Sequence, residues 1–157
     1  MEYTTQMDAA RKGIVTEELR KVAEKEHFEV NELMALVAEG KAAIPANKNH
    51  RCLDPNGIGS MLMTKINVNL GTSRDCKDLD MELEKVNYAV GMGAESIMDL
   101  SSWGDTQKFR RKLTAECPAI IGTVPIYDAV VYYHKPLKDI TTEEWLKIVE
   151  MHAEDGV

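Results

Sequence analysis

Three side chains able to contact a small polar molecule recur at a constant interval. Asn69, Met98 and Tyr127 are 29 residues apart, and each closes an apolar run followed by a polar turn and a charged amphipathic stretch. This rhythm is typical of consecutive strand–helix units that deliver one side chain each to the same end of a parallel sheet. Because βα folds build their sites at the carboxyl ends of successive strands, the spacing predicts a shared small-molecule site.

The first of these runs alternates strictly between polar and apolar residues. In Lys65-Ile66-Asn67-Val68-Asn69-Leu70, the polar side chains point to one face of a strand and the apolar ones to the other. Strands covered on both faces usually read as continuous apolar runs, so a polar row needs polar partners. Two interpretations stay open: a polar pocket, with Asn67 as a further lining residue, or a solvated edge strand.

The other two runs carry plainer alternatives. After Met98, an aspartate and two serines could belong to a site, but turn and cap chemistry explains such residues after most strands. Tyr127 follows Pro125, and a proline ordinarily argues against a central strand at its position. A tyrosine there also fits a core or an interface. His50, in a polar loop, is a second lining candidate, with a plain surface histidine as its alternative.

The elements that must position these residues form two predicted regions. Residues 1–59 read as a helical preface and a polar loop, and residues 60–157 read as three strand–helix units. Hydroxyl caps, acidic first turns, terminal glycines and apolar periodicity predict the boundaries. We expect helices over residues 16–27, 29–39, 76–92, 105–115 and 141–152, and strands over residues 61–70, 96–100 and 119–126.

Composition narrows the functional class. The chain of 157 residues is 44% hydrophobic and 29% charged, as expected for a soluble globular protein, and the alternation of strands and helices predicts the α/β class. Its formal net charge of −7 disfavours binding to nucleic acid or to an anionic membrane surface. The first residues lack the pattern of a secretory signal, and no apolar stretch is long enough to span a bilayer. We therefore expect a cytoplasmic protein without nucleic-acid or membrane partners.

Three cysteines, Cys52, Cys76 and Cys117, are too far apart in the sequence for a CxxC pair. An odd count argues against a disulfide framework, and the spacing does not suggest a zinc or iron–sulfur site. Isolated cysteines are most often small buried hydrophobes. The four histidines likewise lack an HxH or HxxxH partner, so we expect no metal ligands within this chain.

Five segments in fixed order resemble one enzyme family, the phosphomethylpyrimidine synthases (ThiC). The resemblance covers nearly all of the chain but only the amino-terminal part of that family's sequence. It is carried by the segments Thr5-Gln6-Met7-Asp8-Ala9-Ala10-Arg11, Ile44-Pro45-Ala46-Asn47-Lys48-Asn49-His50, Lys65-Ile66-Asn67-Val68-Asn69-Leu70-Gly71, Met98-Asp99-Leu100-Ser101 and Gly122-Thr123-Val124-Pro125-Ile126-Tyr127.

The resemblance implies a radical S-adenosylmethionine enzyme, a carbon–carbon lyase of thiamine biosynthesis. The family converts aminoimidazole ribotide to hydroxymethylpyrimidine phosphate in a (β/α)8 TIM-type barrel, of which this chain would form an incomplete part with three βα units. The family's cofactors are S-adenosylmethionine, a [4Fe-4S] cluster bound by carboxyl-terminal cysteines, and zinc. We expect this chain alone to bind none of them and to be inactive alone, and we expect the full-length family to form homo-oligomers.

Carried over by motif, Asn69, Met98 and Tyr127 match the family's substrate-contacting positions. The implied roles are hydrogen bonding by the amide of Asn69, apolar or backbone contact at Met98, and hydrogen bonding by the phenol of Tyr127. The resemblance assigns no catalytic residue within this chain. Cys52 and Cys117, like Cys76, match none of the cluster cysteines.

Two other classes of function stay open. The chain could be a non-catalytic assembly module, completed by a separate carboxyl-terminal chain or by self-association through unpaired strands. It could also belong to an unrelated barrel enzyme acting on a phosphorylated sugar, although no Schiff-base lysine or general-base constellation is evident. Sedimentation with the missing portion, and titration with aminoimidazole ribotide, would discriminate among these alternatives.

Overall fold

The computed structural model describes residues 3–157, which divide into two compact units. The first unit comprises residues 3–46 and 54–65, and the second comprises residues 47–53 and 66–157. The segment 47–53, which belongs to the predicted polar loop, thus packs with the strand–helix region rather than with the helical preface. Among residues 3–157, no helix combines the length and apolarity needed to cross a membrane.

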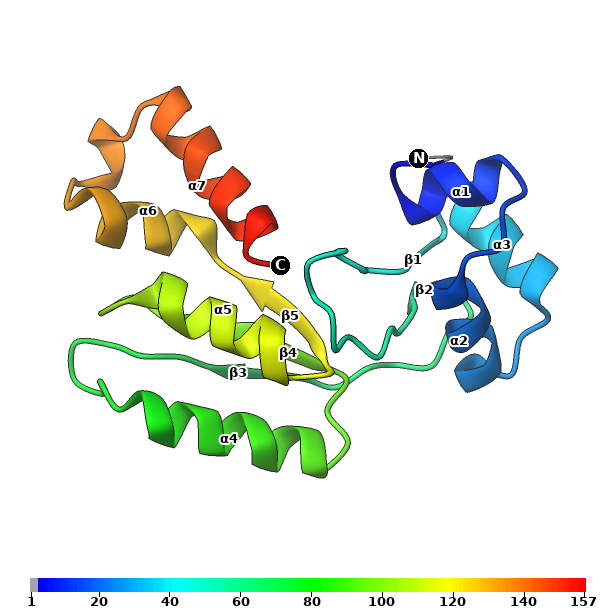
Figure 1. Ribbon diagram of the computed structural model, residues 1–157, viewed down its shortest axis with the longest axis horizontal. Coiled ribbons are helices and arrows are strands. Elements are labelled where there is room, and N and C mark those ends of the chain that lie inside the picture. Colours follow the sequence, from blue (N-terminus) through cyan, green and yellow to red (C-terminus); the bar gives the residue numbers. More distant parts are fainter. Residues whose placement is uncertain (1–2) are drawn as a thin grey trace. The chain divides into compact units, whose positions relative to one another are not determined.

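The first unit contains three short helices and a small hairpin (Figure 1). Its elements are α1 (Gln6–Arg11), α2 (Glu17–Glu26), α3 (Val30–Ala38), β1 (Ala42–Ala43) and the antiparallel β2 (Ile58–Gly59). The Thr16 hydroxyl caps α2 by accepting the N–H of Leu19 at 3.1 Å, which confirms the predicted start signal. The apolar faces of the helices meet in a core that includes Leu19, Val22, Leu33 and Val37.

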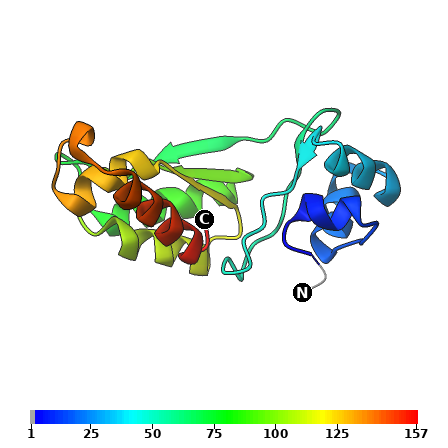
Figure 2. The same ribbon diagram turned by 90° about the horizontal axis from the view of Figure 1, so that it is seen from above.

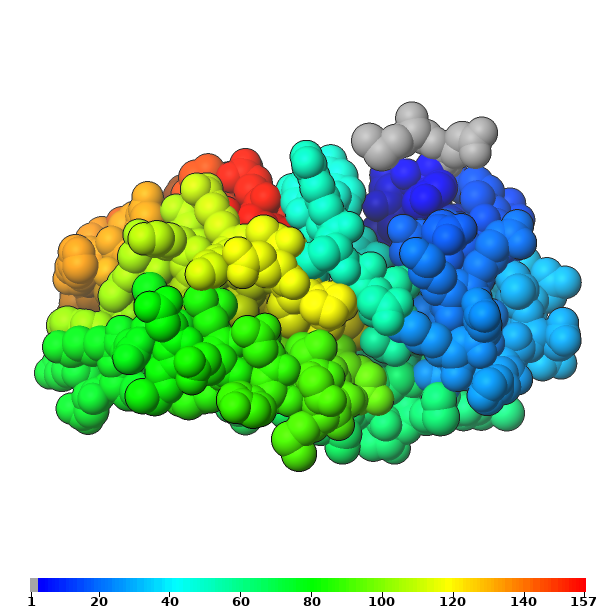
Figure 3. Space-filling model, turned by 60° about the horizontal axis from the view of Figure 1, so that its bottom comes forward, coloured from blue at the N-terminus to red at the C-terminus, as the bar shows by residue number. Residues whose placement is uncertain are grey.

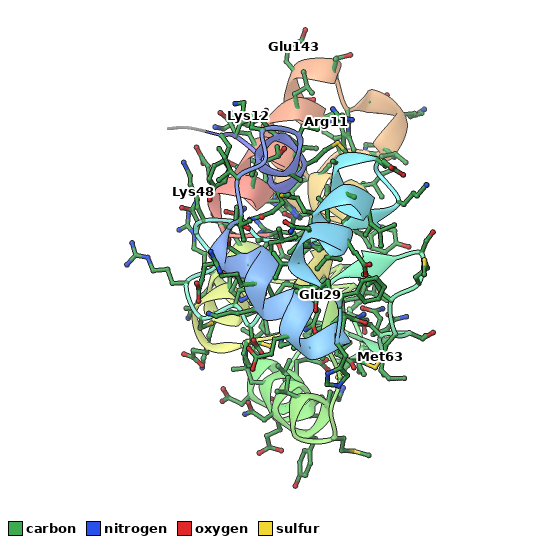
Figure 4. The ribbon with its side chains drawn as sticks, turned by 90° about the vertical axis from the view of Figure 1, so that its right-hand side faces the viewer. Arg11, Lys12, Glu29, Lys48, Met63 and Glu143 are labelled. Atoms are coloured by element: carbon green, nitrogen blue, oxygen red, sulfur yellow. The ribbon has the colours of Figure 1, made fainter. Side chains whose placement is uncertain are left out.

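One buried ion pair secures the end of the first unit. The Glu26 carboxylate pairs with Lys65 and accepts the backbone N–H of Met63 at 2.8 Å. Figure 4 labels Met63, whose side chain is exposed. The predicted strand over residues 61–70 is therefore too long, because Lys65 turns toward Glu26 and Met61 adopts a φ of 67°, outside the β region.

The second unit is built on a parallel three-stranded sheet in the order β3-β4-β5. The sequence order of its elements is strand, helix, strand, helix, strand and then two further helices with a short 3-10 turn between them. They are β3 (Asn67–Leu70), α4 (Leu79–Gly91), β4 (Ser96–Asp99), α5 (Thr106–Glu116), β5 (Ile120–Thr123), α6 (Pro125–Tyr133), η1 (Leu137–Asp139) and α7 (Thr142–Glu154). The mixed α/β class is confirmed, and the three strands do not form a closed barrel.

Helices α4 and α5 cover one face of this sheet (Figure 2). The side chains of Leu70, Ile97 and Ile121 point into that layer, where they meet Val86 of α4 and Phe109 of α5. Figure 3 shows the green α4 and the yellow-green α5 side by side on the surface of this unit. Because successive side chains alternate, the residues between these apolar positions face away from the helices.

The predicted carboxyl end of the third strand was wrong. The strand was expected to run through residue 126, but β5 ends at Thr123 and α6 begins at Pro125. A proline fits the first turn of a helix, because its φ is already near the helical value and its missing N–H would have no partner there. The apolar run that follows Pro125 therefore forms α6, a helix that the sequence analysis did not predict, and Tyr127 lies on that helix.

Candidate functional site

The open face of the sheet brings two of the three predicted contact residues together. Asn69 of β3 and Met98 of β4 are register partners in the parallel ladder, and Met98 is in turn the partner of Gly122 in β5. The Asn69 side chain is exposed and Met98 is half-buried. An amide and a thioether thus lie next to each other near the carboxyl ends of adjacent strands, where βα proteins place their sites.

The Met98 side chain packs against Gly122, which has no side chain of its own. A Cβ atom added at Gly122 would lie 2.9 Å from the Cε of Met98 and 3.0 Å from its sulfur. Both distances are shorter than van der Waals contact, so the thioether occupies the space that any larger residue at this position would fill. The absence of a side chain at Gly122 therefore sets where Met98 presents its polarizable sulfur.

A hydrogen-bonded row crosses the same face. The Ser96 hydroxyl donates to Oδ1 of Asn67 at 2.9 Å, and Nδ2 of Asn67 donates to Oδ1 of Asn69 at 3.1 Å. Ser96 and Asn67 are register partners on β4 and β3. The predicted polar row is thus Asn67 and Asn69 with Ser96, while Lys65 belongs to the ion pair of the first unit. Sequence reasoning missed Ser96, although the same 29-residue step places it opposite Asn67.

The structure places the other predicted site residues elsewhere. Tyr127 lies in the first turn of α6, directly after the carboxyl end of β5, and its side chain is 48% exposed. His50 is 6% exposed, and its Nε2 donates to the backbone carbonyl of Cys117 at 2.7 Å. Because Cys117 precedes β5, His50 lies at the amino end of that strand. The structure therefore gives His50 a structural contact, at the sheet end opposite to Asn69.

Polar loops at the carboxyl ends of β3 and β4 are bonded to each other. The N–H of Thr72 donates to the Ser101 hydroxyl at 3.0 Å, and the Thr72 hydroxyl donates to the carbonyl of Trp103 at 2.7 Å. Asp99, at the end of β4, is buried and accepts the N–H of Ser101 at 2.9 Å. Burial raises the pKa of Asp99 above its ordinary value, against the opposing hydrogen bond from Ser101. Turn chemistry, the plainer alternative for these residues, accounts for their contacts.

A buried polar network joins the helices that follow β4 and β5. Asp128 of α6 accepts hydrogen bonds from the Thr106 hydroxyl, from Nη1 of Arg110 at 3.0 Å and from Nε2 of His152 at 2.9 Å. Arg110 also pairs with Asp155 at 2.9 Å. Burial alone would raise the pKa of Asp128, but the bonds from His152 and Thr106 and the charge of Arg110 together lower it. The sequence contains these residues without a motif that relates them, because the network forms only when α5, α6 and α7 pack together.

Two hollows on the second unit lie away from the asparagine row. One, of about 400 Å³, includes Asn49, Arg111 and Glu154 in its lining, and the other, of about 190 Å³, lies between α4 and α5. Neither is lined by Asn69 or Met98. Asn69 is itself exposed on the face of the sheet that α4 and α5 leave uncovered.

The described residues do not provide a metal centre. Over residues 3–157, no three His, Cys, Asp or Glu side chains gather in an arrangement that could bind a metal ion. Cys52 lies against the backbone carbonyl of Cys117, with its Sγ 3.3 Å from that oxygen, and Cys76 lies on a different loop. These side chains do not fit the cysteine ligands of an iron–sulfur cluster or a zinc ion.

Comparisons with known proteins extend over nearly the whole chain. The family model described as "Radical SAM ThiC family" matches residues 5–157. The chain is 65% identical over 156 residues to phosphomethylpyrimidine synthases from Clostridium botulinum strains 657 and Hall, and 63% identical over 157 residues to that of Clostridium novyi. These alignments cover 99–100% of this chain but 36% of each relative. The chain therefore belongs to the radical SAM ThiC family and corresponds to an amino-terminal portion of it.

Proposed function

We propose that this chain supplies part of the substrate-binding surface of an enzyme of thiamine biosynthesis. In the proposed reaction, aminoimidazole ribotide is converted to hydroxymethylpyrimidine phosphate by radical S-adenosylmethionine chemistry. The observation that carries the proposal is the register pairing of Asn69 with Met98 on the open face of the sheet. The name of the relatives, phosphomethylpyrimidine synthase, supports a substrate with a planar nitrogen-containing ring.

The proposed roles follow from the chemistry of each side chain. The Asn69 amide hydrogen-bonds the ring edge, and the Met98 thioether packs against the ring, a contact that sulfur makes favourably with aromatic systems. Tyr127 projects from the first turn of α6 with an exposed phenol that can reach a ligand above the strand ends. We further propose that the three βα units belong to a (β/α)8 barrel, and that a carboxyl-terminal remainder binds the [4Fe-4S] cluster, S-adenosylmethionine and zinc.

Binding of aminoimidazole ribotide tests the proposed surface directly. Calorimetric titration of the chain should show binding that Asn69→Ala weakens roughly three- to tenfold, as expected for the loss of one net hydrogen bond. Asn87→Ala is the matched control, because Asn87 is an exposed asparagine on α4. Equal affinities for the two variants, or no binding by the parent chain, would contradict the proposal.

Turnover tests the proposed division of labour. The chain, after iron–sulfur reconstitution and with S-adenosylmethionine and a reductant, should form no hydroxymethylpyrimidine phosphate, because its described residues offer no ligand set for the cluster. A full-length relative assayed in parallel is the positive control. Product formation by the chain alone, detected by mass spectrometry, would show that the proposed division is wrong.

A second candidate function rests on the open edges of the sheet. β3 and β5 each have one strand neighbour, so each leaves one edge unpaired in the part of the chain that the structure describes. Unpaired edges can accept another strand, which favours an assembly role. Sedimentation of the chain, alone and with the carboxyl-terminal part of a relative, tests this role: a monomer under both conditions would remove it.

A further inference from the structure

The row of side chains across β4 and β3 has a defined hydrogen-bond direction. The Ser96 hydroxyl donates to the Asn67 carbonyl oxygen, and the Asn67 amide nitrogen donates to the Asn69 carbonyl oxygen. Each asparagine amide has one accepting and one donating end. The bond from Asn67 turns Oδ1 of Asn69 toward the row, so the Nδ2 group of Asn69, with its two N–H donors, is the end of the amide that faces away from the row and toward a ligand.

We propose that Ser96 and Asn67 are positioning residues that fix the orientation of the Asn69 amide, so that Asn69 offers N–H donors to a ligand. The inference rests on the proposed function and deepens it by assigning the ligand chemistry: a planar ring with a hydrogen-bond acceptor on the edge that faces Asn69. A ring that presents only donors at this edge is disfavoured, because its N–H would meet the N–H groups of Asn69.

The backbone makes this arrangement stiff. Asn67 and Ser96 are register partners in the parallel ladder, so their Cα atoms are held opposite each other by the sheet. The backbone N–H of Ser96 donates to the carbonyl of Ile66 at 3.1 Å, which extends the pairing by one residue. Ser96 is half-buried while the two asparagines are exposed, so the row begins in a shielded position and ends at the surface.

The orientation of the Asn69 amide matters because Met98 lies beside it on the sheet. Asn69 is the register partner of Met98, whose thioether lies where a Gly122 side chain would otherwise be. A ring packed on that sulfur therefore has its edge directed at the Asn69 amide. A reversed amide would present an oxygen to the same edge and would select a donor instead.

The side-chain amide signals of the ¹⁵N-labelled chain test the row without any ligand. Ser96→Ala should shift the NH₂ signals of both Asn67 and Asn69, because it removes the first donor of the row. Ser96→Thr retains a hydroxyl and should restore them. Ser102→Ala is the matched control, since Ser102 is an exposed serine after β4 whose side chain makes no hydrogen bond in the described part of the chain. Unchanged Asn69 signals in Ser96→Ala would overturn the proposal.

Two small rings test the direction. At alkaline pH, 1-methylimidazole offers only an acceptor and pyrrole offers only an N–H donor. We expect 1-methylimidazole to shift the Asn69 NH₂ signal and pyrrole to leave it unchanged. Ser96→Ala should weaken the apparent affinity for 1-methylimidazole, measured from this shift, roughly three- to tenfold. A response to pyrrole alone would show that the amide has the opposite orientation and would overturn the assignment.

Failure of this inference is distinguishable from failure of the proposed function. If aminoimidazole ribotide binds and Asn69→Ala weakens it, but Ser96→Ala leaves both the affinity and the Asn69 signal unchanged, the row has no positioning role and the substrate proposal stands. If Ser96→Ala shifts the asparagine signals but aminoimidazole ribotide does not bind, the row exists and the proposed substrate is wrong.

Discussion

Replacement of Asp128 by asparagine should destabilise the second unit more than any surface change. The Asp128 carboxylate is 3% exposed and accepts three hydrogen bonds from side chains of two other helices, two of them from Arg110 and His152. An asparagine at this position can accept at one oxygen, but its NH₂ group faces donors. Asp128→Asn therefore leaves Arg110, itself buried, with Asp155 as its remaining counter-charge.

The expected cost follows from the loss of one partner in a buried ion pair. Such a loss typically costs about 3–5 kcal/mol, and because Asp155 still neutralises Arg110 we expect about 3 kcal/mol for Asp128→Asn. Domains of this size are usually stable by about 5–15 kcal/mol, so the change is measurable and leaves the chain folded at moderate temperature. Asp139→Asn is the control, because Asp139 is exposed on η1, and it should change the free energy of unfolding by less than about 0.5 kcal/mol.

Tryptophan fluorescence during urea unfolding is a suitable assay. Both tryptophans, Trp103 and Trp145, lie in the second unit, and Trp145 packs against the cluster of α6 and α7 that contains Ala129 and Ile148. The signal therefore reports the unit that contains Asp128. A loss below about 1 kcal/mol for Asp128→Asn would refute the reasoning, because it would show that the buried carboxylate is not needed to balance Arg110.

The pH dependence provides a second readout for the same residue. The folded pKa of Asp128 lies below its ordinary value, so the unfolded chain binds more protons than the folded chain in the acidic range. Its contribution is fully present above the unfolded pKa of about 3.9 and is lost as the pH falls through the lower folded pKa. We expect the stability of the parent chain to decline on acidification and Asp128→Asn to show a shallower decline. Parallel pH profiles would contradict this assignment.

Three further predictions follow from other contacts. Asp99→Asn should leave the free energy of unfolding at pH 7 unchanged or raise it, because burial raises the pKa of Asp99 and the folded state therefore disfavours its charge; urea unfolding that shows a clear loss would contradict this. Glu26→Gln should lower the free energy of unfolding by about 2–3 kcal/mol and speed amide exchange at Met63, because the Glu26 carboxylate accepts the N–H of Met63. Unchanged exchange would refute this role of the carboxylate. Gly122→Ala should displace the methyl signal of Met98 in a ¹³C spectrum while changing stability by less than about 1 kcal/mol, since a flexible side chain can move; an unmoved methyl signal would disprove the close approach.

Local sequence signals predicted the alternation of strands and helices and the placement of Asn69 and Met98 at the same end of the sheet. The 29-residue step works for these two residues because register partners on β3 and β4 are 29 residues apart, whereas partners on β4 and β5, such as Met98 and Gly122, are 24 residues apart. It fails for Tyr127, since Pro125 starts a helix where the apolar run suggested a strand. Propensity alone cannot separate a buried strand from a short helix in an apolar run.

Residues that act through tertiary packing were beyond sequence reasoning. His50 reads as a surface residue in a polar loop, yet it is buried against the carbonyl of Cys117, because segment 47–53 packs with the second unit. The network of Arg110 and Asp128 has no local signature for the same reason. Ser96 is the exception, since the regular step that related Asn69 to Met98 also relates Asn67 to Ser96.

Contacts between the Met98 methyl group and a bound ring test the central claim most directly. With the methionine methyls labelled with ¹³C and aminoimidazole ribotide in excess, we predict nuclear Overhauser contacts from the ligand's ring protons to the Met98 methyl and to the Asn69 NH₂ group. Contacts only to methyl groups of other methionines, such as Met34, which packs against the core of the first unit, would contradict the account.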